Sequence, residues 1–207
     1  VFNYDAKNID FRNMSRFDEA EAYILQTKAT GQASQGITPL YGFVVDSLEI
    51  TPGQDKSGTL VLTPLVRHVT FTVQVDKPEE IKTCKGSLSG VSTSLNLSKR
   101  KVVTEASTNV EFDMETSDKG VNGDLIILGT ALPKEEEQKP VTNQVTIDFT
   151  LSDGSMVSAT ADLEDKLNEI DTPHVNVTIN ATVEKSPKFT IRLTNWEVGP
   201  GEETTIE

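Results

Sequence analysis

The residue types that most often perform nucleophilic chemistry are scarce in this chain. It has one cysteine, Cys84, and two histidines, His68 and His174. A catalytic thiol needs a base beside it to remove its proton, and these two imidazoles are the only histidines that could serve. Both lie in segments that alternate as strands, and no nucleophile signature surrounds Cys84. We therefore expect Cys84 to be a small, half-buried hydrophobic side chain.

Carboxylates are abundant, but their setting does not favour catalysis. Glycoside hydrolysis uses two carboxyl groups, one of which has its pKa raised, for example by desolvation. No carboxylate here lies inside an apolar run, and Asp113 and Asp148 fall on the polar faces of predicted strands. The consecutive glutamates 135–137 belong to a predicted solvated loop, 133–140, without the spacing of a calcium loop. We predict no catalytic, cofactor-binding or metal-ligating residues and no cofactor.

Trp196 is the single tryptophan, and an exposed tryptophan can stack on a sugar ring. It directly follows the predicted strand 189–194 and precedes Gly199-Pro200-Gly201. We expect its indole to close one end of a barrel or sandwich; a ligand platform is the alternative.

Charge and motifs exclude several functions. The 207 residues carry 19 Lys+Arg and 32 Asp+Glu, for a formal net charge of -13. Such a chain repels phosphate backbones, which disfavours nucleic-acid binding, and a basic membrane-surface patch is disfavoured too. No phosphate-binding loop, dinucleotide glycine motif, zinc spacing or nucleophile elbow occurs. One cysteine allows no disulfide within a monomer.

No run of 18 apolar residues occurs, and no signal peptide is visible. The chain opens on Val1 rather than Met, so we expect a processed protein or a fragment whose native amino end is unknown.

The elements that must position these residues are strands. Apolar and polar residues alternate strictly in several segments, which is typical of antiparallel sheets with one wet face. Asp153-Gly154 gives the clearest hairpin signal. The continuously apolar run 125–128 predicts either a central strand or one that passes beneath a loop. The predicted strands are 69–75, 145–151, 155–161, 175–183 and 189–194, with a weaker strand at 110–114 and a short one near 87–91.

Helices are few and short. Leu163, Leu167 and Ile170 recur at helical spacing, which predicts a helix over 162–170. The segment 15–25 could form a second helix, or its end could form a strand over 23–27.

A domain boundary is predicted near residue 58, where the segment 51–58 is linker-like. We expect 1–58 to be a partial N-terminal β domain or subdomain and 59–207 to be the C-terminal sandwich. The run 59–75 changes its apolar phase at Pro64, which predicts a strand that bends or passes between sheets.

Several stretches resemble one family of surface proteins. They include TPLYGFVVDSLEITPG, the run TLVLTPLVRHVTFTVQV followed by KGSLSGVSTSLNLS, and the final KFTIRLTNWEVGPG. With the opening VFNYDAKNIDFRNMSRFDEAEAYI and the segment VTIDFTLSDGSMVSATADLEDKLNEI, they are similar to the fimbrillin-like surface lipoproteins of Bacteroidales. The nearest relatives of this kind are an uncharacterised Bacteroides lipoprotein domain family and the minor fimbrial anchor proteins.

The resemblance implies stacked β-sandwich domains of transthyretin-like topology. It also implies a lipid-modified cysteine near the amino end of the precursor and a location at the outer membrane and cell surface, in the fimbrium. This chain has no such cysteine, and its first domain looks shortened by about half.

We therefore expect an all-β protein: one main antiparallel β-sandwich, a partial N-terminal domain and one or two short helices. The predicted function is that of a non-enzymatic structural or adhesion protein, a pilus subunit, anchor or tip. Its partners would be other pilus or surface proteins. Strand donation at an exposed edge is one way in which they could bind. The candidate edges are 101–114, whose charges discourage pairing, and 189–196. The alternative is a glycan-binding surface lipoprotein, and a carboxylate hydrolase is a third, weaker option.

Overall fold

The computed structural model describes residues 2–3, 5–26, 36–45, 52–53, 55, 57–131, 143–163, 166–169, 172–185 and 189–201. Within these residues the fold is almost entirely β. The short helical turns are η1 (Phe17–Glu19), η2 (Pro78–Glu80) and α1 (Lys166–Glu169). The strands are β1 (Ile9–Arg12), β2 (Glu21–Ile24), β3 (Tyr41–Gly42), β4 (Thr63–Pro64), β5 (Arg67–Val75), β6 (Ile81–Asn96), β7 (Lys101–Ser117), β8 (Gly120–Ile127), β9 (Gln144–Leu151), β10 (Met156–Asp162), β11 (His174–Lys185) and β12 (Phe189–Pro200).

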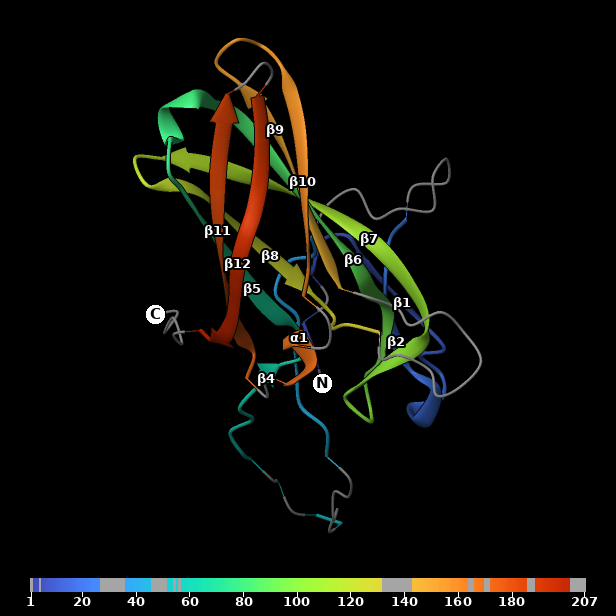
Figure 1. The fold of residues 1–207 in the computed structure, drawn as a ribbon. Helices are drawn as coiled ribbons and strands as arrows, with labels where there is room; N and C mark the ends of the chain where they lie inside the picture. The colour runs from blue at the N-terminus through green and yellow to red at the C-terminus, as the bar shows by residue number, and fades with distance from the viewer. Residues whose placement is uncertain are drawn as a thin grey trace.

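Two layers form because β7 and β8 separate soon after their hairpin. These strands pair only from Met114 to Ser117 against Gly120 to Gly123. Beyond that point β7 continues with β6, β9 and β10, whereas β8 continues with β5, β11 and β12. Strands β10 and β12, at the far ends of the two layers, come close again without pairing. Figure 1 shows β11 and β12 as an upright hairpin, with β6 and β7 as a long ribbon that reaches β1 and β2.

The inward side chains of both layers meet in one hydrophobic core. Alternate residues of β5, β9 and β11 are buried, as their sequence pattern predicts. The layers touch directly where the rings of Phe71 and Phe112 stack, with their centroids 4.8 Å apart. Gly86 lies beside Phe112 in the register and leaves room for that ring. The predicted all-β sandwich is confirmed.

One strand pair differs from the expected antiparallel arrangement. Strands β5 and β11 run parallel, with His68 opposite His174 and Val73 opposite Ile179. Alternation fixes which side chains face inward but carries no information on strand direction.

The predicted strands have the correct inward phase, but several are longer than predicted. β12 continues past residue 194 to Pro200 because Thr194 forms a bulge opposite Asn180 and Ala181. The bulge moves the inward phase from Ile191 and Leu193 to Trp196 and Val198, so simple alternation stops there. Likewise the predicted strand at 87–91 belongs to the 16-residue β6, and the strand at 110–114 belongs to β7.

The helix predictions are only partly correct. α1 spans Lys166–Glu169, and its flanking Leu163 and its own Leu167 are buried as predicted. The rest of the predicted helix includes residues 164–165 and 170, which lie outside the described residues. A helix over 15–25 is wrong: only the 3₁₀ turn η1 forms, and Ala20 is extended before β2. Pairing of β2 with both β1 and β6 favours the extended backbone.

The change of phase at Pro64 marks a passage between sheets, as predicted. β4 pairs with β3 in a separate two-stranded sheet, whereas β5 belongs to the large sheet. The run 125–128 passes beside a loop, because the Ile37 N–H donates to the Ile126 carbonyl. β1 and β2 join the large sheet through β6. The division at residue 58 stays a prediction, and the predicted loop 133–140 lies outside the described residues.

We predict that Gly86→Ala destabilises the protein. A Cβ atom at residue 86 would lie 2.3 Å from Cζ of Phe112, so the stacked rings would have to move. Overpacking of this kind costs about 1–3 kcal/mol, and each kcal/mol lowers the Tm of a chain of this size by about 2–4 °C. Gly199→Ala is the matched control, because a Cβ there meets nothing within 4 Å. Equal Tm values for the two variants in a circular-dichroism melt would contradict the prediction.

Candidate functional site

The structure separates the side chains that could have formed a thiol–imidazole pair. Cys84 is buried on the inner face of β6, where its thiol donates to the Met114 carbonyl at 3.6 Å. Burial raises the pKa of this thiol to about 11. His68 and His174 lie on β5 and β11 in the other layer. Cys84 is therefore a packing residue, more deeply buried than predicted.

The two histidine rings lie side by side on the outer face of their layer, where the ring of His68 is hydrogen-bonded. Their rings lie edge to face with centroids 5.5 Å apart. Nε2 of His68 lies 3.1 Å from Oδ1 of Asp124, and the Thr70 hydroxyl donates to the same oxygen at 2.8 Å. Within the part of the chain that the structure describes, no group of three His, Cys, Asp or Glu side chains could hold a metal ion.

Trp196 faces the core side of β12. It lies opposite Ile179 in the register, and its half-buried indole packs against the core. Phe17 is the only aromatic among the large hydrophobic side chains that are exposed within the described ranges. Asp113 and Asp148 lie on exposed faces, as predicted, on either side of Lys85 in the register.

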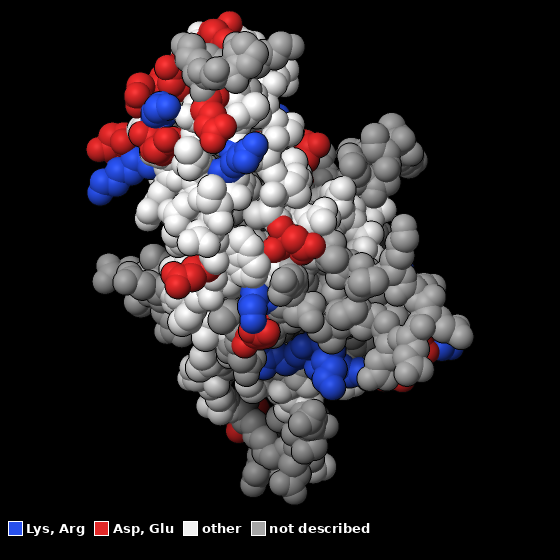
Figure 2. Space-filling view, in the orientation of Figure 1, with Lys and Arg blue, Asp and Glu red and all other residues white. Residues whose placement is uncertain are grey.

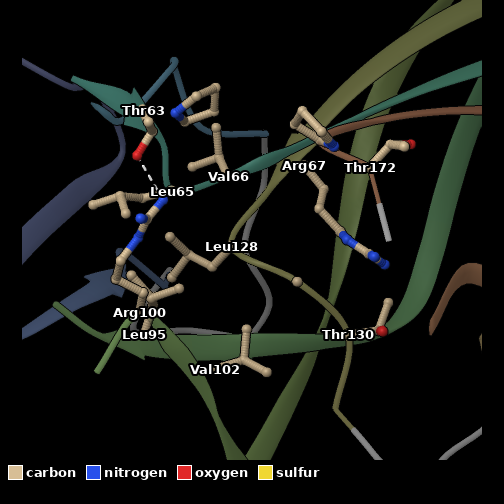
Figure 3. A pocket seen from close by; sticks show the side chains of 13 residues that line it. Thr63, Leu65, Val66, Arg67, Leu95, Arg100, Val102, Leu128, Thr130 and Thr172 are labelled. Atoms are coloured by element: carbon tan, nitrogen blue, oxygen red, sulfur yellow. Dashed lines mark hydrogen bonds between the residues drawn. The ribbon is translucent and has the colours of Figure 1, made fainter. Parts of the chain in front are cut away.

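A pocket of about 570 Å³ lies where the two layers separate. Its walls come from β4 and the start of β5, from the end of β6 and the start of β7, and from the segment after β8. Leu65, Val66, Leu95 and Leu128 are buried and form an apolar floor. Figure 3 shows that the guanidinium groups of the two arginines lie on opposite sides of this floor. The polar lining consists of Arg67, Arg100, Thr63, Thr130 and Thr172.

The β6–β7 turn positions Arg100 at the rim of this pocket. Oδ1 of Asn96 accepts hydrogen bonds from the Lys99 N–H at 2.8 Å and the Ser98 hydroxyl at 2.9 Å, which closes the turn. Arg100 then takes the left-handed conformation, with a φ of 54°. Its Nη2 donates to the Thr63 hydroxyl at 2.6 Å, and that hydroxyl donates to the Gly42 carbonyl at 3.2 Å.

Arg67 reaches the pocket from the opposite side, and its Nη1 donates to the Leu167 carbonyl of α1. Gly129 closes the wall between them, because the backbone passes so near Val102 that a Cβ would lie 2.5 Å from its Cγ1. Figure 2, in the orientation of Figure 1, shows several Lys and Arg side chains close together at the level of α1 and β4. Sequence reasoning missed this pocket, since its residues come from segments as far apart as 63 and 173.

The sheet also leaves strand edges without a partner. Among the described strands, β12 pairs only with β11, and β10 pairs only with β9. Along β7, residues 101–113 pair only with β6, because β8 pairs from Met114 onward. Both edges expected from the sequence, 101–114 and 189–196, are thus sheet edges over most or all of their length.

An apolar surface lies at the end of the molecule that carries β3 and β4. Met14, Phe17 and Val45 are exposed and line a cavity of about 420 Å³ with Phe2 and Leu97. Leu60, Val61 and Leu62 are also exposed and lead directly into β4. We call these six exposed side chains the apolar end; they are Met14, Phe17, Val45, Leu60, Val61 and Leu62.

Comparison with known proteins agrees with this architecture. A family model described as a domain of unknown function (DUF5119) matches residues 1–113. A candidate adhesin from Bacteroides ovatus has a similar solved structure, with 21% identity, a TM-score of 0.56, and coverage of 98% of this chain and 74% of that chain. No curated protein matches the sequence.

Two further solved structures share the fold at lower identity. The fimbrial anchor protein Mfa2 from Porphyromonas gingivalis is 10% identical, with a TM-score of 0.53 and coverage of 97% of this chain and 73% of that chain. A candidate polysaccharide-binding protein (DUF1812) from Bacteroides thetaiotaomicron is 12% identical, with a TM-score of 0.50 and coverage of 95% of this chain and 73% of that chain. These neighbours confirm, for the fold, the resemblance to fimbrillin-like surface proteins. No helix in the described ranges is long and apolar enough to cross a membrane.

We predict that Cys84 reacts slowly with thiol reagents in the native protein. A pKa near 11, against an ordinary value of 9.0, leaves about one thiolate in a thousand at pH 8 instead of about one in ten. Burial hinders access further. Colorimetric thiol titration at pH 8 should give a native rate at least about a hundredfold below the rate in denaturant. Rapid, complete labelling without unfolding would be inconsistent with this burial.

Proposed function

Because the chain belongs to the family described as a domain of unknown function (DUF5119), and shares its fold with candidate adhesins and a fimbrial anchor protein, we propose that it is a non-enzymatic structural or adhesion protein of the cell surface. More specifically, it is a fimbrillin-like component of a pilus, whether subunit, anchor or tip. Its precursor carries a lipid anchor that holds it at the outer membrane.

The observation that carries this proposal is the edge of β12, which has no hydrogen-bonded partner among the described strands except β11, although β10 approaches it. An edge strand offers free backbone N–H and C=O groups to an extended segment of another chain. Leu193, Trp196 and Val198 lie on the core side of β12 but are only partly buried. A strand added beside β12 would both satisfy the backbone and complete the burial of these side chains.

The second edge, residues 101–113 of β7, is a weaker acceptor. Its exposed residues include Lys101, Glu111 and Asp113, and charged side chains discourage edge-to-edge pairing. Along β12 the described exposed charges are Arg192 and Glu197. We therefore assign strand addition to β12.

The apolar end provides a further region for contact with a partner. Exposed hydrophobic side chains that gather around one cavity, as Met14, Phe17 and Val45 do, are typical of interaction surfaces. Six of the eight large hydrophobic side chains exposed in the described ranges belong to this end. The chain thus has a backbone edge and an apolar surface that suit an assembly role.

We predict that β12 contacts other surface proteins in the native cell. Thr190→Cys, labelled with a benzophenone maleimide and irradiated on intact cells, should give covalent adducts, because Thr190 is exposed on β12. Gln74→Cys is the matched control, because Gln74 is also exposed and β5 lies between β8 and β11 within the sheet. The unmodified chain controls for the buried Cys84. Equal adducts from both variants, or none from Thr190→Cys, would count against strand addition at β12.

We also predict that protease added to intact cells digests the full-length protein. A surface location exposes loops to the protease, whereas a periplasmic marker protein in the same cells stays intact. Immunoblots before and after lysis measure both. Protection of this protein until lysis would rule out the proposed location.

A further inference from the structure

We propose that the pocket between the two layers binds an organic anion that carries a single carboxylate on an apolar body. This inference goes beyond the proposed function, because it does not depend on assembly at β12 or on the location of the protein. It rests on the charge, the shape and the backbone conformation of the pocket.

Charge is the first argument. The chain has a net charge of -13, yet the 13 residues that line the pocket include two arginines and no Asp or Glu. A concave site lined by one sign of charge concentrates ligands of the opposite sign. Guanidinium groups match carboxylates in shape and can donate two parallel hydrogen bonds.

The backbone at Arg100 is the second argument. A φ of 54° favours glycine or asparagine, and arginine there costs stability. The turn is already closed by Asn96, so Arg100 is not needed to form it. Instead, its guanidinium is held at the rim by Thr63, which accepts from one of its five N–H groups. Its other N–H groups have no partner among the described residues that line the pocket.

The floor of the pocket is the third argument, and it determines the rest of the ligand. Leu65, Leu95 and Leu128 are buried below the arginines, with Val102 beside them. Such a floor accommodates an aliphatic or aromatic body, whereas a bare inorganic anion would leave it uncovered. The volume of about 570 Å³ lies within the usual range for small-molecule sites. The carboxylate therefore lies at Arg100, and the apolar body lies over the leucines.

Titration of the ¹⁵N-labelled full chain with octanoate, followed by NMR, tests the proposal. We expect saturable shifts at Thr63, Leu128 and Thr130, with weaker binding at high salt. Octanamide has the same apolar body without the charge and should bind about tenfold more weakly or not at all. The peptide acetyl-Ala-Leu, with a free or an amidated carboxyl end, distinguishes a free acid from the carboxyl terminus of another chain.

Variants of Arg100 separate binding from folding. Arg100→Gln should weaken octanoate binding about ten- to a hundredfold. Arg100→Gly should abolish it while the Tm stays the same or rises, because glycine adopts the left-handed conformation without strain. Lys99→Gln removes an exposed charge from the same turn, outside the pocket lining, and should leave binding unchanged.

The proposal fails if neither octanoate nor the peptide with a free carboxyl end gives saturable shifts in the pocket. It also fails if octanamide binds as well as octanoate, or if Arg100→Gln and Lys99→Gln weaken binding equally. Binding of only the peptide with a free carboxyl end would support the carboxylate site and assign it to a chain terminus.

Discussion

The backbone edges of β6 impose the constraint on which the rest of the structure depends. A buried strand must pair its N–H and C=O groups on both sides, and β6 is 16 residues long. One side pairs with β7 along most of its length. The other side meets three partners in turn: β9, then the segment at Thr130, then β2. Gly90, in the left-handed region with a φ of 71°, gives the strand its bend between the first two.

Polar groups complete the pairing at that bend. The Ala131 N–H donates to the Gly90 carbonyl, and the Ser92 N–H donates to the Gly129 carbonyl, both at 2.9 Å. Asn143, which is buried, donates to the Ser89 and Gly90 carbonyls. Because these contacts bring the chain from β8 across to β6, they close one end of the sandwich. The segment that crosses from β8 to β6 also forms one wall of the pocket between the two layers.

The pocket and the unpaired edge of β7 share one origin, the separation of β7 from β8. If those strands had paired throughout, residues 101–113 of β7 would have had partners on both sides. The space between the layers beyond Met114 must instead be filled by side chains and by the segment at 128–130. That filling is incomplete above Leu95 and Leu128, and the pocket remains there. The separation therefore leaves both a strand edge without a partner and a pocket between the layers.

The sequence by itself determined the strand character of the chain and the inward face of each strand, because alternation has a period of two and burial follows it. It also predicted that Cys84 is a packing residue and that Asp113 and Asp148 lie on the polar faces of strands, and the structure shows Cys84 buried and both aspartates exposed. Only the tertiary structure decided the parallel pairing of β5 with β11, the bulge at Thr194 and the length of β6, because hydrogen bonds between distant strands set direction and register. It alone placed Arg67 and Arg100 around one apolar floor, since no local pattern records which distant turns meet.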